Sequence, residues 1–303
     1  MDKLDAMAIF VAVVQEGGFS AAARRLGVSA PVVTRAVGEL EAAMNVRLLV
    51  RTTRVVKVTE VGERYAQDCR RVLGELQDIE QAASGSHGAV RGKLVVSAPV
   101  MYGRLQLNQV VLAYLERYPE TEVECRFLDR NVNLLNEDVD VAVRIGDLPD
   151  ASFHATPLAT VRRVAVASPK YLQRKGMPKQ PKDLEKHTLI AALGVEFGAE
   201  WKFREGSGLE AATIAVPVRA WLATNSNDHA IAAAAQGLGI TRVLSYMVET
   251  QLASGELVEV LAKHAPPPVP VQALQHQGPR ASRKVRAFID FFVERIGPQP
   301  YWD

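Results

Sequence analysis

The sequence lacks three features that would each define a class of protein: paired cysteines, a long apolar run and a strong net charge. Its two cysteines, Cys69 and Cys125, are too few and too far apart for a disulfide framework or a zinc site. No stretch approaches the roughly 18 apolar residues of a membrane span, and Asp2 and Asp5 lie where a signal peptide is basic. We therefore expect a cytoplasmic protein with no metal, no cofactor and no membrane contact.

The charge of the chain is informative in its location rather than in its sum. A net charge of +2 over 303 residues, with 48% hydrophobic and 23% charged residues, is ordinary for a globular protein of two or three domains. Between Ser20 and Lys57, seven basic side chains outnumber two acidic ones, a local balance of +5. The basic residues are Arg24, Arg25, Arg35, Arg47, Arg51, Arg54 and Lys57, and the acidic ones are Glu39 and Glu41. Such a cluster is typical of nucleic-acid binding.

Apolar spacing in this basic region predicts three helices. The first runs from Leu4 to the glycines at 17–18, the second covers 21–26 behind a Ser20 cap, and the third runs from 30 to about 44. Ser29 suits the N-cap of the third helix and Pro31 its first turn. Two helices joined by a glycine-containing turn form a helix-turn-helix, although the helix lengths alone also fit an ordinary helical hairpin.

A basic β-hairpin, the wing, is predicted after the third helix, with strands over 47–51 and 55–59 and a turn over 52–54. The third helix would enter the major groove, while the wing would reach phosphates or the adjacent minor groove. We assign Thr34 and Arg35 to base edges or phosphates and the wing cations mainly to the backbone, each having a solvated surface position as its alternative. The predicted DNA contacts are Ser29, Pro31, Val33, Thr34, Arg35, Arg51, Thr53, Arg54 and Lys57.

A long helix is predicted after the wing, with Thr59 as its cap and acidic residues in its first turn. Its apolar residues alternate at spacings of four and three, a heptad pattern that favours pairing with the same helix of a second chain. The residues of this predicted dimerisation seam are Tyr65, Cys69, Val72, Leu76, Ile79 and Ala83. The alternative is a helix that folds back on its own domain. Residues 84–88 then form a flexible joint.

The remainder of the chain alternates between strands and helices and indicates an α/β fold. Strands are predicted at 94–96, 121–127, 139–146, 164–167, 189–192, 214–218, 239–243 and 271–275. Helices are predicted at 104–118, 131–137, 228–236, 245–253 and 283–296. The proline run at 266–268 marks a crossover that returns the chain to its first α/β set. Two lobes joined by two crossovers would leave a cleft between them.

No catalytic constellation appears in this half of the sequence, which has neither a glycine-rich phosphate loop nor a nucleophile elbow. Because ligands of open α/β sheets bind at strand carboxyl ends, the candidates for effector binding are Ser97, Pro99, Arg130, Arg144, Asn225 and Asn227. Arg144 is the strongest of these, since a guanidinium suits a carboxylate ligand. An interlobe salt bridge with Asp140 or Asp147 is its alternative.

Specific motifs of the N-terminal region resemble the signature of LysR-type transcriptional regulators. They are FSAAARRLGVS at 19–29, RAV at 35–37, ELE at 39–41, RLL at 47–49, RTTR at 51–54 and TEVG at 59–62. Weaker marks of the family's effector domain are DVAVRIG at 140–146 and AAQGLGI at 234–240. The chain departs from the family at Ala30-Pro31 and at Thr34, near the start of the recognition helix, so base preference is not transferred.

The resemblance implies a multidomain bacterial regulator: a winged helix-turn-helix over 1–59, a linker and dimerisation helix over 60–86 and a two-lobed effector domain over 87–303. That domain would resemble type II periplasmic binding proteins, with lobe I at about 90–160 and 268–303 and lobe II at about 161–267. A small-molecule effector, an organic anion by the chemistry of Arg144, would bind between the lobes. Implied partners are double-stranded promoter DNA, a homodimer or homotetramer, and RNA polymerase.

Three other functions stay open at this point. A solute-binding protein for transport shares the two lobes, but an export signal is lacking and a basic wing is present. A thiol redox sensor would use Cys125, although that residue lies in a predicted strand with no evident resolving partner. An enzyme with an unnoticed site is the third. We predict a regulator that is not an enzyme, in which the effector shifts the arrangement of the lobes and, through it, the spacing of the DNA-binding modules.

Overall fold

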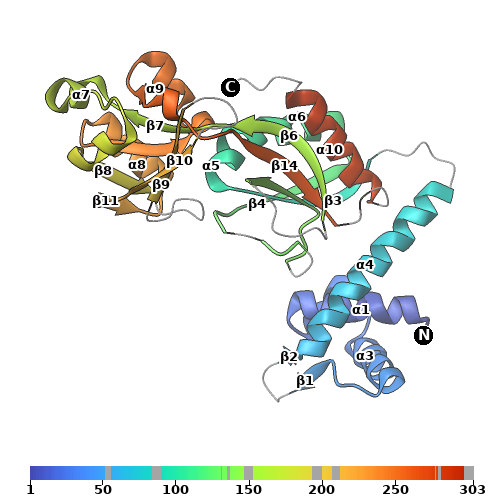
Figure 1. Ribbon diagram of the computed structural model, residues 1–303. Coiled ribbons are helices and arrows are strands. Elements are labelled where there is room, and N and C mark those ends of the chain that lie inside the picture. The colour runs from blue at the N-terminus through green and yellow to red at the C-terminus, as the bar shows by residue number, and fades with distance from the viewer. Residues whose placement is uncertain are drawn as a thin grey trace. The chain divides into compact units, whose positions relative to one another are not determined.

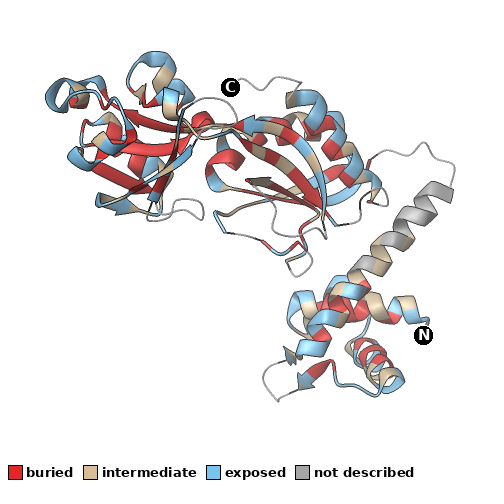
Figure 2. Ribbon diagram, viewed as in Figure 1, coloured by how far each residue is buried: buried red, intermediate tan, exposed pale blue. Residues whose placement is uncertain are grey.

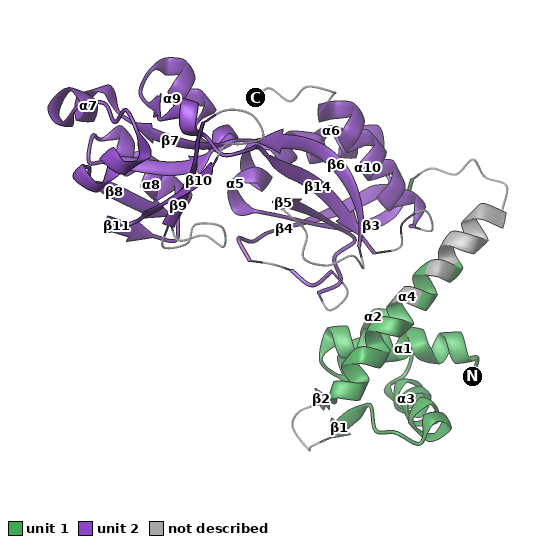
Figure 3. Cartoon of the chain, in the orientation of Figure 1, with its two compact units in different colours: residues 1–90 green, residues 91–303 purple. Residues whose placement is uncertain are grey.

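The computed structural model describes residues 1–51, 56–83, 90–130, 132–134, 137–146, 153–192, 200–206, 212–276, 278 and 281–296. Its contacts divide the chain into two compact units, residues 1–90 and 91–303, called here the N-terminal and C-terminal units (Figure 3). Buried residues form a core inside each unit (Figure 2). None of the helices among the described residues is long and apolar enough to cross a membrane.

Three helices build the core of the N-terminal unit, as the sequence predicts. They are α1 (Lys3–Glu16), α2 (Phe19–Leu26) and α3 (Ala30–Met44) (Figure 1). Phe10 of α1 is completely buried and belongs to one core cluster with Ala22 and Ala23 of α2 and Val37 of α3. Gly17 and Gly27 end α1 and α2 in the left-handed region, at φ of 68° and 67°, where a side chain would be strained. The predicted cap at Ser20 is wrong, because α2 begins one residue earlier, after Gly18.

The wing and the linker helix follow α3. Strand β1 (Leu49–Arg51) pairs antiparallel with β2 (Val56–Val58), and helix α4 (Glu60–Ala83) begins two residues later. The strands are shorter than predicted, and the predicted turn at 52–54 lies outside the described residues. The hydroxyl of Thr59 accepts the backbone N–H of Gly62 at 2.9 Å, which caps α4 as its sequence predicts.

The C-terminal unit contains two five-stranded sheets of the same topology, each within one lobe. Lobe I has the order β4 (Thr121–Phe127), β3 (Gly92–Ala98), β5 (Val141–Ile145), β14 (Val269–Gln275) and β6 (His154–Val161). Lobe II has the order β11 (Ala220–Thr224), β8 (Leu189–Ala192), β12 (Ile240–Leu244), β7 (Arg163–Ala167) and β13 (Val258–Val260). In each sheet the first three strands are parallel to one another. The fourth strand pairs antiparallel with the third, and the fifth pairs antiparallel with the fourth.

Helices flank both sheets. In lobe I, α5 (Val100–Tyr102), a π-helical segment (Gly103–Leu107) and α6 (Asn108–Arg117) follow one another, and α10 (Arg283–Ile296) packs beside α6. The ring of Tyr114 meets that of Phe288 edge-on at 5.1 Å between centroids and closes this side of the core. Lobe II carries α7 (Pro169–Lys175), α8 (Asn227–Ala235), α9 (Glu249–Ser254) and the hairpin of β9 (Glu200–Glu205) with β10 (Ala212–Pro217).

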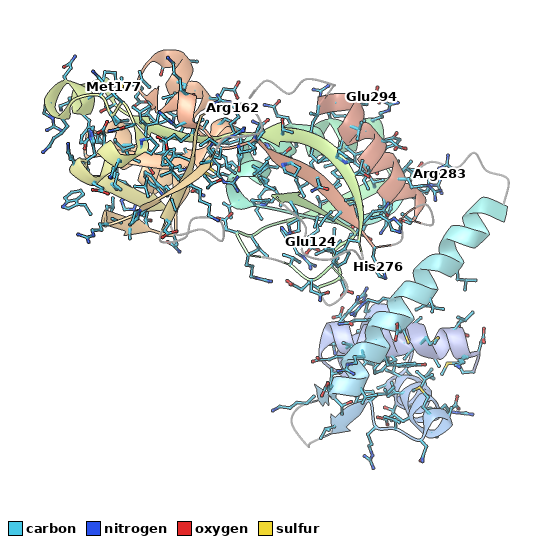
Figure 4. The ribbon with its side chains drawn as sticks, viewed as in Figure 1. Glu124, Arg162, Met177, His276, Arg283 and Glu294 are labelled. Carbon is cyan, nitrogen blue, oxygen red and sulfur yellow. The ribbon has the colours of Figure 1, made fainter. Side chains whose placement is uncertain are left out.

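The chain crosses between the lobes twice, as predicted. Arg162 alone separates β6 from β7, and residues 261–268 lead from β13 to β14 (Figure 4 labels Arg162). The peptide of Arg162 exchanges hydrogen bonds with Ser245: its N–H donates to Ser245 Oγ at 3.1 Å, and its carbonyl accepts the Ser245 N–H at 2.8 Å. The guanidinium of Arg162 pairs with Glu259 at 3.1 Å. This crossover is therefore held at a defined position.

The predicted helix at 131–137 is not found in the part of that segment that the structure describes, where residues 134, 137 and 138 form turns. Val132 and Leu134 of this segment are buried instead, in a hydrophobic cluster with Ala142 of β5 and Leu274 of β14. Strands β6, β9, β11 and β13 were not predicted. Strands β6, β11 and β13 lie at sheet edges, and exposed side chains in β6 and β11 interrupt the apolar pattern that a buried strand shows.

Candidate nucleic-acid interface and effector site

The exposed face of α3 carries most of the DNA contacts predicted for that helix. Pro31, Thr34 and Arg35 are exposed, and Ser29, also exposed, occupies the N-cap with extended backbone. The predicted DNA contact of Val33 is wrong, because its side chain is 0% exposed and belongs to the core. Its neighbour Val32, at 40% exposure, presents an apolar side chain instead. The exposed surface at the start of α3 therefore combines the polar side chains of Thr34 and Arg35 with apolar Pro31 and Val32.

Arginines of this unit are oriented by carboxylates. The Nε of Arg35 donates to Glu39 at 2.7 Å, one turn later on α3, and this bond lowers the pKa of Glu39. Arg25 on α2 donates to Gln15 at 2.8 Å and to Glu16 at 3.0 Å at the end of α1. The side chain of Arg35 remains 78% exposed in this pair. The pair therefore orients the guanidinium and leaves it accessible to a phosphate.

The wing places Lys57 on an exposed surface. Lys57 on β2 pairs with Val50 on β1, and both side chains are exposed. Arg51 belongs to β1, but its side chain is not described, and Thr53 and Arg54 lie outside the described residues. Of the four residues predicted for the wing, Lys57 alone therefore has a described side chain.

The first part of the predicted dimerisation seam packs inside its own unit. Cys69 is 0% exposed, and the ring of Tyr65 lies 5.7 Å from that of Phe10, with burial raising the pKa of Tyr65 to about 12. The prediction that these two residues form a dimer contact is therefore corrected: α1 packs against α4, and both residues pack in the core of their own unit. Val72 and Leu76 are half-buried, and the side chains of Ile79 and Ala83 are not described.

Two buried polar groups lie on one face of the lobe I sheet. Ser97 on β3 pairs with Ala142 on β5, and Arg144 lies two residues further along β5, so both side chains point to the same face. The Ser97 hydroxyl and one terminal nitrogen of Arg144 are buried and have no hydrogen-bond partner among the described residues. Burial lowers the pKa of Arg144. Buried polar groups are almost always paired, so these two atoms are candidates for contact with a bound polar group.

The surroundings of Arg144 decide against one alternative. Asp140 accepts the backbone N–H of Val95 at 2.8 Å and contacts Lys284 at 3.4 Å, so it does not neutralise Arg144. Asp147 lies outside the described residues. Arg130 forms a two-bond pair with Glu137, at 2.8 and 2.6 Å, which lowers the pKa of Glu137 to about 2. Asp140 and Glu137 thus have other hydrogen-bond partners, and the negative charge of Glu137 opposes the lowering of the Arg144 pKa that burial causes.

The other predicted cleft residues lie at the edges of the lobes. Pro99 is half-buried and precedes α5, while Asn225 is exposed on lobe II. Asn227 begins α8, and its Oδ1 is buried without a partner among the residues described. A pocket of about 410 Å³ lies between the lobes, lined by Arg104, Asp228 and side chains of α8 and α9, but none of the six predicted residues lines it.

Direct contacts hold the lobes together beside this pocket. Arg104, in the π-helical segment of lobe I, forms an ion pair of 2.5 Å with Asp228 on α8 of lobe II. The buried rings of Tyr102 and Tyr246 meet edge-on at 5.4 Å between centroids. In the part of the chain that the structure describes, an exposed polar contact and a buried aromatic contact therefore both link the lobes.

Comparison with known families settles the identity of both units. Residues 4–63 match the model described as bacterial regulatory helix-turn-helix protein, lysR family. Residues 87–297 match the LysR substrate binding domain. The chain belongs to the LysR family. It is a LysR-type transcriptional regulator with a DNA-binding helix-turn-helix and an effector-binding domain, and not an enzyme. Regulators of this family bind promoter DNA and small-molecule effectors, and they form oligomers.

Relatives of this regulator align over most of its length. A probable regulator named LtrA, from Klebsiella pneumoniae, is 33% identical over 261 residues, which are 86% of this chain and 83% of LtrA. The structure of CrgA from Neisseria meningitidis has a TM-score of 0.62 and 28% identity, covering 97% of this chain and 98% of CrgA. The Vibrio cholerae virulence activator AphB has a TM-score of 0.60 and 26% identity, covering 97% and 99%. The predicted fold class is confirmed.

Several residues that organise the sites of this LysR-type regulator were not predicted. Arg104 and Asp228 are separated by more than 120 positions, and no local pattern relates them. Glu41 was noted as an acidic residue within the basic cluster and as part of the motif at 39–41, but its structural role was not predicted: its carboxylate holds the start of the wing. The available signal was the position itself, since a carboxylate beside so many cations usually has a structural partner.

The ion pair between the lobes yields a testable prediction. Replacing Arg104 by alanine should change the free energy of unfolding by less than about 1 kcal/mol, because both partners are about half exposed and solvent screens their attraction. It should nevertheless alter the separation of the lobes, which fluorescence transfer between labels on Leu112 and Met177 would measure. Arg117→Ala, on α6 away from lobe II, is the control. An unchanged distance distribution would contradict a linking role for Arg104.

Proposed function

We propose that this regulator binds promoter DNA with the exposed face of α3 and the wing, and that a small organic anion bound at Arg144 changes that binding. The observation that carries the effector class is the half-buried guanidinium of Arg144: one terminal nitrogen donates to the carbonyl of Val143 at 3.3 Å, and the other is buried with no partner among the described residues, on the sheet face that also carries the hydroxyl of Ser97. A carboxylate offers acceptors to both groups and neutralises the buried cation.

The lobes provide the means by which binding would be transmitted. Arg144 and Ser97 belong to lobe I, while Asn227 on lobe II carries a buried amide oxygen without a partner in the described part of the chain. An anion with a hydroxyl or amine substituent would satisfy groups from both lobes. A ligand with more contacts in one lobe arrangement than in another shifts the population toward it, and this shift would alter the spacing of the DNA-binding modules in an oligomer.

The DNA-binding part of the proposal predicts a steep dependence on salt. Each neutralised phosphate contributes a slope of about −0.9 to log K against log salt, so six to ten contacts weaken binding roughly 10³- to 10⁵-fold between about 50 and 200 mM. Fluorescence anisotropy with a fragment from upstream of its own gene measures this slope. A flat curve would argue against DNA as the partner.

The effector class is tested by thermal unfolding with a panel of small carboxylates, such as malonate, succinate and benzoate, against the matching uncharged amides. We expect at least one carboxylate to raise the unfolding temperature and to change the DNase footprint of the protein on that fragment. Its amide should do neither, because it lacks the charge that Arg144 requires. An equal response to amides and acids would refute an anionic effector.

A further inference from the structure

The peptide of Leu48 joins three elements of the N-terminal unit. Glu41 on α3 accepts the backbone N–H groups of Leu48 and Leu49 with the same oxygen, Oε1, at 2.8 and 3.0 Å. On the other side, the carbonyl of Leu48 accepts the hydroxyl and the backbone N–H of Thr59, both at 3.0 Å. Thr59 is the cap of α4. The recognition helix, the wing and the linker helix thus meet at one peptide group.

Burial gives this junction its rigidity. The side chains of Leu48 and Leu49 are 0% exposed in the core that α1, α2 and α3 form. Gly62 of α4 lies directly against the carbonyl of Leu48, so close that a Cβ there would overlap it. Strand β1 has only three residues, so its paired region alone offers little to fix its direction. The bonds from Glu41 supply a second anchor.

We propose that Glu41 is a positioning residue for DNA recognition, which fixes the wing relative to the recognition helix so that both reach the same stretch of duplex. The inference rests on the proposed DNA contacts of α3 and the wing. Charge complementarity supports it. A carboxylate on a surface that meets phosphates opposes binding unless it is engaged, and both bonds of Glu41 direct it inward to backbone donors.

The geometry distinguishes hydrogen bonding from charge as the cause. Because both N–H groups bond to a single oxygen, Glu41→Gln keeps an acceptor at the same distance and loses only the charge. Glu41→Asp keeps the charge but is one methylene too short to reach either N–H group. Glu41→Ala removes both. If Glu41 positions the wing, Gln should preserve recognition, whereas Asp and Ala should impair it.

The experiment measures binding of the full-length variants to the upstream fragment across salt concentrations, together with hydroxyl-radical footprints. For Asp and Ala we expect binding weaker by about tenfold or more, as the loss of bonds to a charged group predicts. The salt slope should also shrink by about 0.9 for each phosphate that the wing no longer contacts, and the footprint should lose its outer protections while keeping those of α3. The Gln variant should stay within about threefold of the original protein.

Glu63→Asp and Glu63→Gln are the matched controls, since Glu63 is exposed on the first turn of α4 and the same changes of charge and length occur there. They should leave the slope and footprint unchanged. Two results would overturn the inference: a salt slope for Glu41→Asp equal to that of the original protein, or DNA binding by Glu41→Gln as weak as that of Glu41→Ala. If Ala fails to fold, the comparison of Gln with Asp still decides. Weak, salt-independent binding by the original protein would instead refute the proposed DNA contacts themselves.

Discussion

Replacing Gly62 by alanine is expected to lower the free energy of unfolding of the N-terminal unit by about 3 kcal/mol or more, at the upper end of overpacking costs. A Cβ at this position would lie 2.1 Å from the carbonyl oxygen of Leu48 and 3.0 Å from its carbonyl carbon. These are backbone atoms, and the same carbonyl holds Thr59, so it cannot move without uncapping α4. We expect the start of α4 and the wing to separate, with loss of DNA binding.

Chemical denaturation followed by circular dichroism measures this effect. The control is Gly38→Ala, which introduces the same change inside helix α3 of the same unit, where a Cβ meets nothing within 4 Å. That variant should gain up to about 1 kcal/mol, because alanine is the better helix former. If the two variants unfolded with the same free energy, the close approach of α4 to Leu48 would not exist in solution.

Local sequence patterns predicted the elements of the N-terminal unit but not the direction of every side chain. Periodicity and glycine positions were sufficient for α1, α3 and α4. They could not predict that Val33 is buried, because Val32 beside it is also a valine. The packing of the neighbouring helices decides that Val33 is buried and Val32 exposed. Cys69 fits a heptad as well as it fits the core, and the position of α1 decides in favour of the core.

In the C-terminal unit, the sequence predicted the inner strands of both sheets and β4, but it missed the edge strands β6, β11 and β13 and did not predict how the lobes meet. The return of the chain to lobe I through β14 follows from the proline-rich crossover and the final helix. By contrast, the pair Arg104–Asp228 depends on how two folded lobes are oriented, and the orphaned hydroxyl of Ser97 depends on what covers the sheet. Both are properties of tertiary packing, which residue spacing does not encode.

Arg144→Met is expected to reduce the stabilisation by an anionic effector to roughly a quarter, while leaving the unliganded protein as stable as before, or more stable by about 1 kcal/mol. Partial burial of the Arg144 cation costs free energy, and desolvation accordingly lowers its pKa, so an apolar side chain of similar length removes that cost. A hydrogen-bonded charge pair with a ligand is worth roughly 1.5–3 kcal/mol. A carboxylate present at about 100 times its Kd stabilises by about 2.7 kcal/mol, and a roughly 50-fold weaker affinity reduces this to about 0.6.

The measurement is thermal unfolding of both proteins with and without the carboxylate that shifts the original protein most. Arg91→Met is the control, because Arg91 is 59% exposed in a surface pair with Glu120 and its removal should cost less than about 1 kcal/mol and leave the shift intact. A destabilised Arg144→Met protein that still responded to the carboxylate would assign Arg144 a structural role. If Arg144 is the anion-binding group, the unliganded variant must therefore keep or gain stability while its response to the carboxylate falls, as expected from the position of Arg144 on the sheet face shared with Ser97.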